Sequence, residues 1–255
     1  MTALLALSFS LSLPIVASDA DRHFALGVAS RNDGAAARAH FAKAAELLDE
    51  LRAAGVRDPR LALNRARAHR LAGNLPACLA ALHDGLEVAR HDRELQVELE
   101  SARDAVEYAN ADLAAAVRPP PPRGLGTRMS VLELYLIAGG LWLAACLGIA
   151  RYAMTRVPGW LAAAGASLVL LAILAGAWRS DRARIDAENA RPLRILERDH
   201  PLKAGNGDSW PDRLKWPLPA GAEVRELARR GGWVQVELAN GTAGWLPERI
   251  LRATP

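Results

Sequence analysis

Four tryptophans lie close together in the C-terminal part of the chain, and these residues are the best suited to binding. They are Trp210, Trp216, Trp233 and Trp245. A tryptophan ring is large and amphipathic, so one or more of them could line a groove that docks a peptide or a glycan strand. Trp210 and Trp216 lie in a polar stretch and are the better candidates for exposure, whereas Trp233 and Trp245 are more simply interpreted as packing residues of a small barrel. Replacing Trp216 by alanine should spare folding but weaken the capture of a partner.

The sequence contains no recognisable pattern of catalytic or metal-binding residues. HExxH, CxxC, GxSxG and P-loop patterns are absent, and the glycine-rich stretch 203–209 lacks the end of a phosphate-binding loop, so it is better interpreted as a turn. Cys78 and His83 lie on one predicted helix, but neither completes a ligand set. We therefore predict no enzyme activity, no catalytic residue, no cofactor and no metal. The histidines are scattered over the chain, at His23, His40, His69, His83, His91 and His200.

The charge balance argues against a nucleic-acid partner. The chain of 255 residues has 32 Lys and Arg against 28 Asp and Glu, which gives a net charge of +4. Lysine occurs only at Lys43, Lys203 and Lys215, and the arginines are spread among acids, with no basic stripe that alternates with aromatic residues. The two cysteines, Cys78 and Cys146, fall in regions that should not meet, so we predict no disulfide framework.

Residues 192–255, which contain the tryptophans, have the pattern of a small all-β domain. Short alternating stretches are separated by turn residues. Asn240-Gly241 between two of these stretches is a strong hairpin signal, because a two-residue turn needs positive φ at both positions. Glycine–tryptophan pairs follow at 232–233 and 244–245. Together with PLKAGNG in the first hairpin and PAGAEV before the central strand, these features resemble the bacterial SH3-like domain, which implies a small SH3-like barrel with an unusually long insert at 208–218.

Residues 22–117 are predicted to be all-α, because they are rich in Ala, Leu, Glu and Arg and lack alternating Val and Ile. Two segments carry small, large and small residues on one helical face, which is how one helix nests against another. The pattern resembles the tetratricopeptide repeat, although the copies lie further apart than its usual period of about 34 residues. A generic helical bundle is the alternative, and a helix at 94–116 should cap the stack. The matching residues are Ala37, Phe41 and Ala44 in one segment and Cys78, Leu82 and Gly85 in the other.

A membrane hairpin is predicted next, with transmembrane helices at 131–150 and 158–178. The two uncharged apolar runs within them are about 17 to 22 residues long, close to the length that crosses a hydrocarbon core of about 30 Å. The short loop at 151–157 carries Arg151 and Arg156 and no acidic residue. Small residues spaced four apart, Gly140, Ala144 and Gly148 on the first helix, with Ala162, Ala166, Ala172 and Gly176 on the second, should let the two backbones approach closely.

The hairpin is joined to its neighbours by two connecting segments. Residues 118–130 contain four consecutive prolines, which favour an extended polyproline II spacer. A proline-rich ligand for a partner is the alternative role of this linker. Residues 179–191 form a charged connector to the C-terminal domain.

Residues 1–18 resemble a cleaved secretory signal peptide, with an apolar stretch and small residues before Asp19. Since no Lys or Arg precedes Asp19, an uncleaved N-terminal anchor is the alternative. Export would place both soluble domains outside the cytoplasm, with the 151–157 loop inside. Arginines that flank the outer ends of the hairpin argue against this orientation. On balance we predict a protein of the cytoplasmic (inner) membrane with two transmembrane helices and both soluble domains extracytoplasmic.

The order of these segments, a multidomain membrane protein with a signal, helical repeats, two membrane helices and an SH3-like tail, is similar to the BatE-like proteins of Bat aerotolerance operons. The resemblance implies a non-enzymatic scaffold that assembles an envelope complex in stress or oxygen tolerance. It also implies membrane partners with von Willebrand factor A domains and a MoxR-type ATPase system. The alternative function is a cell-wall protein whose periplasmic tail binds peptidoglycan.

Overall fold

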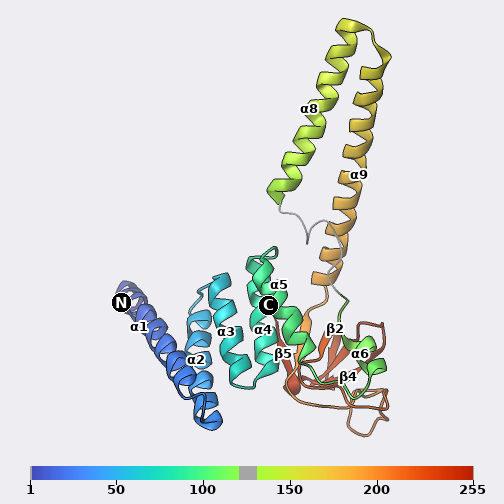
Figure 1. Cartoon of the computed structure of the whole chain (residues 1–255). Helices are drawn as coiled ribbons and strands as arrows, with labels where there is room; N and C mark the ends of the chain where they lie inside the picture. The colour runs from blue at the N-terminus through green and yellow to red at the C-terminus, as the bar shows by residue number, and fades with distance from the viewer. Residues whose placement is uncertain (1, 121–130, 255) are drawn as a thin grey trace. The chain divides into compact units, whose positions relative to one another are not determined.

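The structure, a computed structural model, describes residues 2–120 and 131–254 (Figure 1). These residues form eight α-helices and a C-terminal five-stranded antiparallel sheet. The chain divides into two compact units, Met1–Pro120 with Arg191–Pro255 as one and Pro121–Ala190 as the other. The first unit therefore contains both the N-terminal helices and the sheet, which the sequence predicts to be separate domains. The second unit contains two long apolar helices.

The N-terminal helices begin where the sequence places polar capping residues. Asp33, Asp58 and Asp92 each accept hydrogen bonds from two backbone N–H groups of the following helix, which satisfies donors that have no partner within a helix. Asn74 and Asn110 each accept one such bond. The helices are α1 (Thr2–Ala29), α2 (Gly34–Ala53), α3 (Pro59–Leu71), α4 (Leu75–Val88), α5 (Arg93–Asp104) and α6 (Ala111–Val117).

The helices pack in pairs, α1 with α2 and α3 with α4, and α2 joins the pairs by packing on α3. All six residues that the sequence matched between the two segments are buried. At each pair a glycine brings two helices close together. A Cβ on Gly27 would lie 2.8 Å from the Phe41 ring, and one on Gly85 would lie 2.8 Å from Ala62 Cβ. The described helices therefore have a repeat-like arrangement.

The prediction of a single helix at 94–116 is wrong, because two helices, α5 and α6, cover this range. Asn110 is extended, with φ −161° and ψ 170°, and its side chain accepts a 2.7 Å bond from the Leu113 N–H. This cap starts a new helix, α6. As a result, Leu113 and Val117 pack into the core of the C-terminal sheet.

The sheet has strand order β4-β3-β2-β1-β5, and every neighbouring pair is antiparallel. A register shift between Glu226 and Ala228 bends β2. The outer strands β4 and β5 are not paired with each other in the described residues, so the sheet is not a closed barrel. The strands are β1 (Leu193–Leu196), β2 (Glu223–Arg230), β3 (Trp233–Glu237), β4 (Ala243–Pro247) and β5 (Leu251–Ala253), with a 3₁₀ turn, η1 (Glu248–Ile250), before β5.

The hairpin predicted around Asn240-Gly241 is present between β3 and β4, but its turn is of another type. Gly241 has a φ of 84°, while Asn240 is not among the described residues with positive φ. The Leu238 N–H donates to the Thr242 carbonyl at 2.9 Å, which closes a connection of three residues. A three-residue loop needs only one left-handed position, and glycine occupies it.

The second unit is a helical hairpin of α8 (Val131–Thr155) and α9 (Pro158–Asn189). Helix α8 ends later than the predicted boundary at 150, and the link is reduced to Arg156 and Val157. Arg156 has a φ of 56°, which allows the sharp reversal. Helix α9 continues through most of the predicted connector 179–191.

The hairpin surface is apolar and exposed within the structure. The spans Leu132–Thr155 and Pro158–Ala183 are long and apolar enough to cross a membrane, and only 11% and 6% of their most apolar stretches are buried. Core helices of a soluble protein would be mostly buried. The two spans are therefore candidate membrane helices by length, composition and exposure.

The small residues that hold the hairpin together are only partly those predicted. Ala145 and Ala164 are almost completely buried, and a Cβ on Gly148 would lie 3.0 Å from Ala164 Cβ and from the Trp160 carbonyl. In contrast, Gly140 has no atom near its Cβ position, and Ala144 is exposed. The prediction for Gly148 is therefore confirmed. Those for the other predicted residues are wrong, because the contact follows a different face of each helix; Ala162, Ala166, Ala172 and Gly176 are exposed as well.

Two predicted segments fall partly outside the described residues. In the linker at 118–130, positions 121–130 are not described. Helix α1 passes through the predicted signal-peptide boundary, and Val16 and Ala17 pack against a core that includes Ala20. Cleavage of residues 1–18 remains a prediction.

Candidate functional site

An open groove of about 530 Å³ lies at one end of the sheet. We call it the Trp233 groove. It forms where the β2–β3 turn and the β4–η1 junction meet the long segment between β1 and β2. Its lining combines an aromatic ring, a proline, two acidic residues, an arginine and exposed glycine backbone. The lining residues are Asp208, Gly231, Gly232, Trp233, Pro247, Glu248 and Arg249.

Strand alternation places Trp233 in this groove. Val234 and its partner Leu246 are buried in the sheet core, so Trp233 and its partner Pro247 lie on the opposite face. Gly231 and Gly232 precede Trp233 with φ of 57° and 76°, and no atom lies within 4 Å of a Cβ built on either. Glycine is used here for the left-handed turn. The turn also leaves bare backbone beside the tryptophan ring.

The charges around the groove are of both signs. Glu248 forms a 3.0 Å ion pair with Arg229. Asp208 and Arg249 are exposed, and neither has a hydrogen bond or ion pair through its side chain to another described residue. The groove thus offers a half-buried ring, one free carboxylate and one free guanidinium. This combination can hold an extended ligand that carries both apolar and hydrogen-bonding groups.

The structure brings together only part of the predicted tryptophan set. Trp245 is half-buried on the same sheet face as Trp233, diagonal to it across β3 and β4, but it does not line the groove. Trp210 packs on Gly205, where a Cβ would lie 2.4 Å from the ring, and it is 52% exposed. Trp216 is 44% exposed and lies beside Lys215, whose Nζ is 5.5 Å from the ring centroid.

Several groove residues were not identified from the sequence. Pro247, Glu248 and Arg249 follow the glycine–tryptophan pair at 244–245 closely, and strand alternation from Trp245 would assign Pro247 to the same face. Asp208 was noted only as the start of the insert. Its approach to the β2–β3 turn depends on the path of the β1–β2 segment, for which the sequence carries no local signal.

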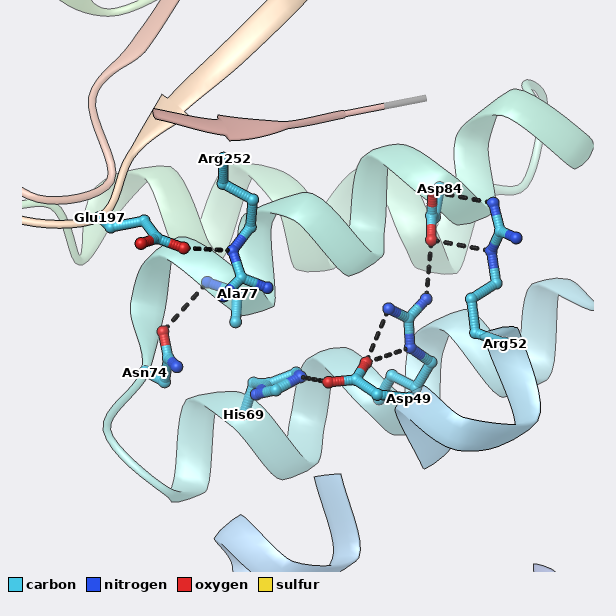
Figure 2. A network of polar contacts seen from close by, with 9 residues as sticks. Asp49, Arg52, His69, Asn74, Ala77, Asp84, Glu197 and Arg252 are labelled. Carbon is cyan, nitrogen blue, oxygen red and sulfur yellow. Dashed lines mark hydrogen bonds and ion pairs between the residues drawn. The ribbon is translucent and has the colours of Figure 1, made fainter. Parts of the chain in front are cut away.

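Apart from the Trp233 groove, a polar cluster within the helical stack joins α2, α3 and α4 (Figure 2). Arg65 binds Asp49 at 2.8 Å on one side and Asp84 at 2.8 Å on the other. Arg52 also donates to Asp84, at 3.0 Å. Among the described residues no buried side-chain nitrogen or oxygen lacks a partner. The cluster is therefore internally satisfied, and we assign it a structural role.

His69 extends this cluster on the α3 side, where its Nε2 lies 3.0 Å from an Asp49 oxygen. Desolvation raises the pKa of Asp49, but the contacts with His69 and Arg65 outweigh it and hold that pKa below its usual value. The carboxylate is thus kept ionised. Its role is to hold two helices together, since both of its oxygens are engaged.

Residues 2–120 and 131–254 contain no candidate metal site. No group of three or more His, Cys, Asp or Glu residues there is arranged to hold a metal ion. Burial raises the pKa of the Cys78 thiol to about 12, so this cysteine is a packing residue and a poor nucleophile.

Comparisons of the chain with protein-family models, with curated proteins and with solved structures give no match. The function must therefore be inferred from the structure itself: the Trp233 groove, the repeat-like helices and the candidate membrane helices.

Proposed function

We propose that this protein is a non-enzymatic, membrane-anchored scaffold that assembles an envelope protein complex of the Bat aerotolerance type. Its helices would be tetratricopeptide-like, its sheet SH3-like, and its partners membrane proteins with von Willebrand factor A domains. The observation that carries the proposal is the Trp233 groove, an open groove with an aromatic ring in a unit attached to two apolar helices.

The fold assignments within this proposal have their own support. Helix pairs with buried small–large–small contacts support the tetratricopeptide-like assignment. Short antiparallel strands and a bulge that bends β2 support a small barrel-like domain. The pattern of residues 1–18 supports export, which would place both soluble segments outside the cytoplasmic membrane.

The groove supports partner binding better than catalysis. It is open and combines an aromatic ring with exposed charges, while no base or nucleophile in it is held by a second group in a catalytic arrangement. A scaffold needs only modest affinity at such a groove, because anchoring confines it and its membrane partners to one surface and raises their effective concentration.

Crosslinking in native membranes, followed by detergent solubilisation, pull-down and mass spectrometry, tests the proposal. We expect the wild-type chain to recover proteins with von Willebrand factor A domains and Trp233→Ala to lose them. Trp216→Ala is the comparison, since its ring is exposed outside the groove. If Trp216→Ala abolished capture while Trp233→Ala did not, the binding site would lie on the β1–β2 segment and the groove assignment would be wrong.

Peptidoglycan binding by the tail is the second candidate function. A tryptophan ring flanked by a free carboxylate and a free guanidinium suits a glycan strand or its peptide stems. Co-sedimentation of the detergent-solubilised full chain with purified sacculi tests it. Sedimentation that depends on Trp233 would favour the wall ligand, and its absence would remove this candidate.

A further inference from the structure

Two segments flank the α8–α9 hairpin in the sequence, residues 2–120 before it and 191–254 after it. Each segment contributes side chains to the hydrophobic core of the other. Leu113 and Val117 of α6 lie in the buried cluster of the sheet. Conversely, Ile195 of β1 lies in the buried cluster of α3, α4 and α5. All three side chains are at most 6% exposed. Separating the segments would expose apolar surface on both.

The backbone of the C-terminal segment lies in close contact with the N-terminal helices. Gly221 has a φ of 86°, and a Cβ there would lie 3.2 Å from a Val106 methyl and 3.3 Å from one of Leu79. The Asn240 N–H donates to the carbonyl of Ala116 at 3.1 Å. The sheet thus contacts the helices both just before β2 and at its β3–β4 loop.

A buried ion pair also joins the two segments. Two guanidinium nitrogens of Arg103, Nε and Nη2, donate to the carboxylate of Glu223 at 2.7 Å, and His83 Nε2 lies 3.1 Å from the same carboxylate. Glu223 is 4% exposed and Arg103 is 8% exposed. A buried charge that loses its partner is strongly unfavourable, so the two residues require each other. They are 120 positions apart in the sequence, with the hairpin between them.

We infer that the α8–α9 hairpin is an insertion within one domain. The segments before and after the hairpin can pack into this domain only when the chain returns to the side of the membrane that it left. The sheet is then the last layer of the helical stack and not a free module. A hairpin that crossed the membrane once would leave each segment with an exposed apolar face and an unpaired charge. Correct insertion of both helices is therefore a condition for folding of the soluble part. The inference is independent of which partner the Trp233 groove binds.

The decisive experiment separates the hairpin from the folded protein. A specific protease site is inserted within 121–130 and another between Ala190 and Arg191 of the full-length chain, which also carries a C-terminal affinity tag. After purification in mild detergent and cleavage at both sites, the tagged fragment from 191 onward is captured. We expect the N-terminal fragment to be retained in equimolar amount while the hairpin is washed away. Elution of the N-terminal fragment with the hairpin would overturn the inference.

A matched pair of variants ties retention to the ion pair. In Glu223→Ala we expect at least a tenfold faster loss of the N-terminal fragment from the captured fragment. Glu94 lies on the same helix as Arg103, α5, and forms an exposed ion pair with Arg67. In Glu94→Ala we therefore expect the wild-type rate. Equal rates in the two variants would show that Glu223 does not join the segments.

Labelling of intact membranes tests the topology without cleavage. Val97→Cys in α5 and Leu227→Cys in β2 place single exposed thiols on either side of the hairpin, in a Cys146→Ser background; Cys78 is fully buried. A membrane-impermeant maleimide should label both variants from the same face of sealed vesicles. Labelling from opposite faces would overturn the inference even if the cleaved fragments associated in detergent.

Discussion

Replacing Glu223 by glutamine should destabilise the soluble unit far more than removing an exposed acid from the same region. The substitution keeps the shape of the side chain but removes the charge that two nitrogens of Arg103 bind at 2.7 Å. Breaking one partner of a buried ion pair costs about 3–5 kcal/mol. Arg103 keeps a 2.8 Å contact with the more exposed Glu100, so we expect the lower end, about 3 kcal/mol.

Pulse proteolysis of the full chain in mild detergent across a urea series measures this loss. With a denaturant slope of about 2 kcal/mol per molar, 3 kcal/mol corresponds to a midpoint lowered by about 1.5 M urea. Glu94→Gln is the control, because its ion pair with Arg67 is exposed and should contribute less than about 1 kcal/mol. Equal midpoints for the two variants would refute the claim that the Arg103–Glu223 pair is buried and needed.

The pH dependence of stability provides a second check on the same residue. Desolvation raises the pKa of Glu223, but the contacts with His83 and Arg103 outweigh it and hold that pKa well below its usual value. A lowered folded-state pKa means that the stabilisation is complete above the unfolded pKa of about 4.3 and declines as the pH falls below it. The wild type should lose stability more steeply than Glu223→Gln below about pH 4, and parallel curves would contradict this assignment.

Three further predictions concern the hairpin, the buried thiol and a close backbone contact. Gly148→Leu should weaken the α8–α9 contact, measured as faster cleavage of the hairpin by protease in detergent, while Gly140→Leu should behave as wild type because nothing lies near its Cβ. Cys78 should stay unreactive toward maleimide at pH 8 until urea unfolds the chain, since burial raises the pKa of its thiol to about 12, and prompt labelling would contradict the packing of α4. Gly221→Val should lower the free energy of unfolding by about 1–3 kcal/mol, seen as a lower urea midpoint, because it combines a strained φ with a clash against Val106, whereas Gly231→Val should cost less because its Cβ meets no neighbour.

The elements with strong local signals could be predicted from the sequence. Capping residues such as Asp33, Asp58 and Asp92 fix where helices begin, because they satisfy backbone donors within a few residues. The apolar runs of the hairpin and the β3–β4 hairpin are also local patterns. The break at Asn110 was missed because an asparagine within an alanine-rich stretch is compatible with either a helix interior or a cap, and packing of α6 on the sheet decides between them.

The candidate site was predictable only in part. Strand alternation puts Trp233 on one face of β3, and a period of two is visible in the sequence. The rest of the groove depends on the long β1–β2 segment, which brings Asp208 to the glycine turn at 231–232, and on the end of β4. For the same reason the sequence favoured Trp216 over Trp233 as the exposed candidate, although Trp216 lies outside the groove and Trp233 lines it.

By itself the sequence determined the local structural elements: capped α-helices, two apolar spans of membrane length, and short strands joined by glycine turns. Each of these follows from interactions between residues close together in the chain. Only the tertiary structure decided that the first and last parts form one unit. The contacts responsible, Arg103 with Glu223, Val106 with Gly221, and Ile195 within the helical core, join residues about a hundred positions apart. No local pattern encodes such a pairing, because it depends on which buried charges and apolar faces remain unsatisfied once the local elements have formed.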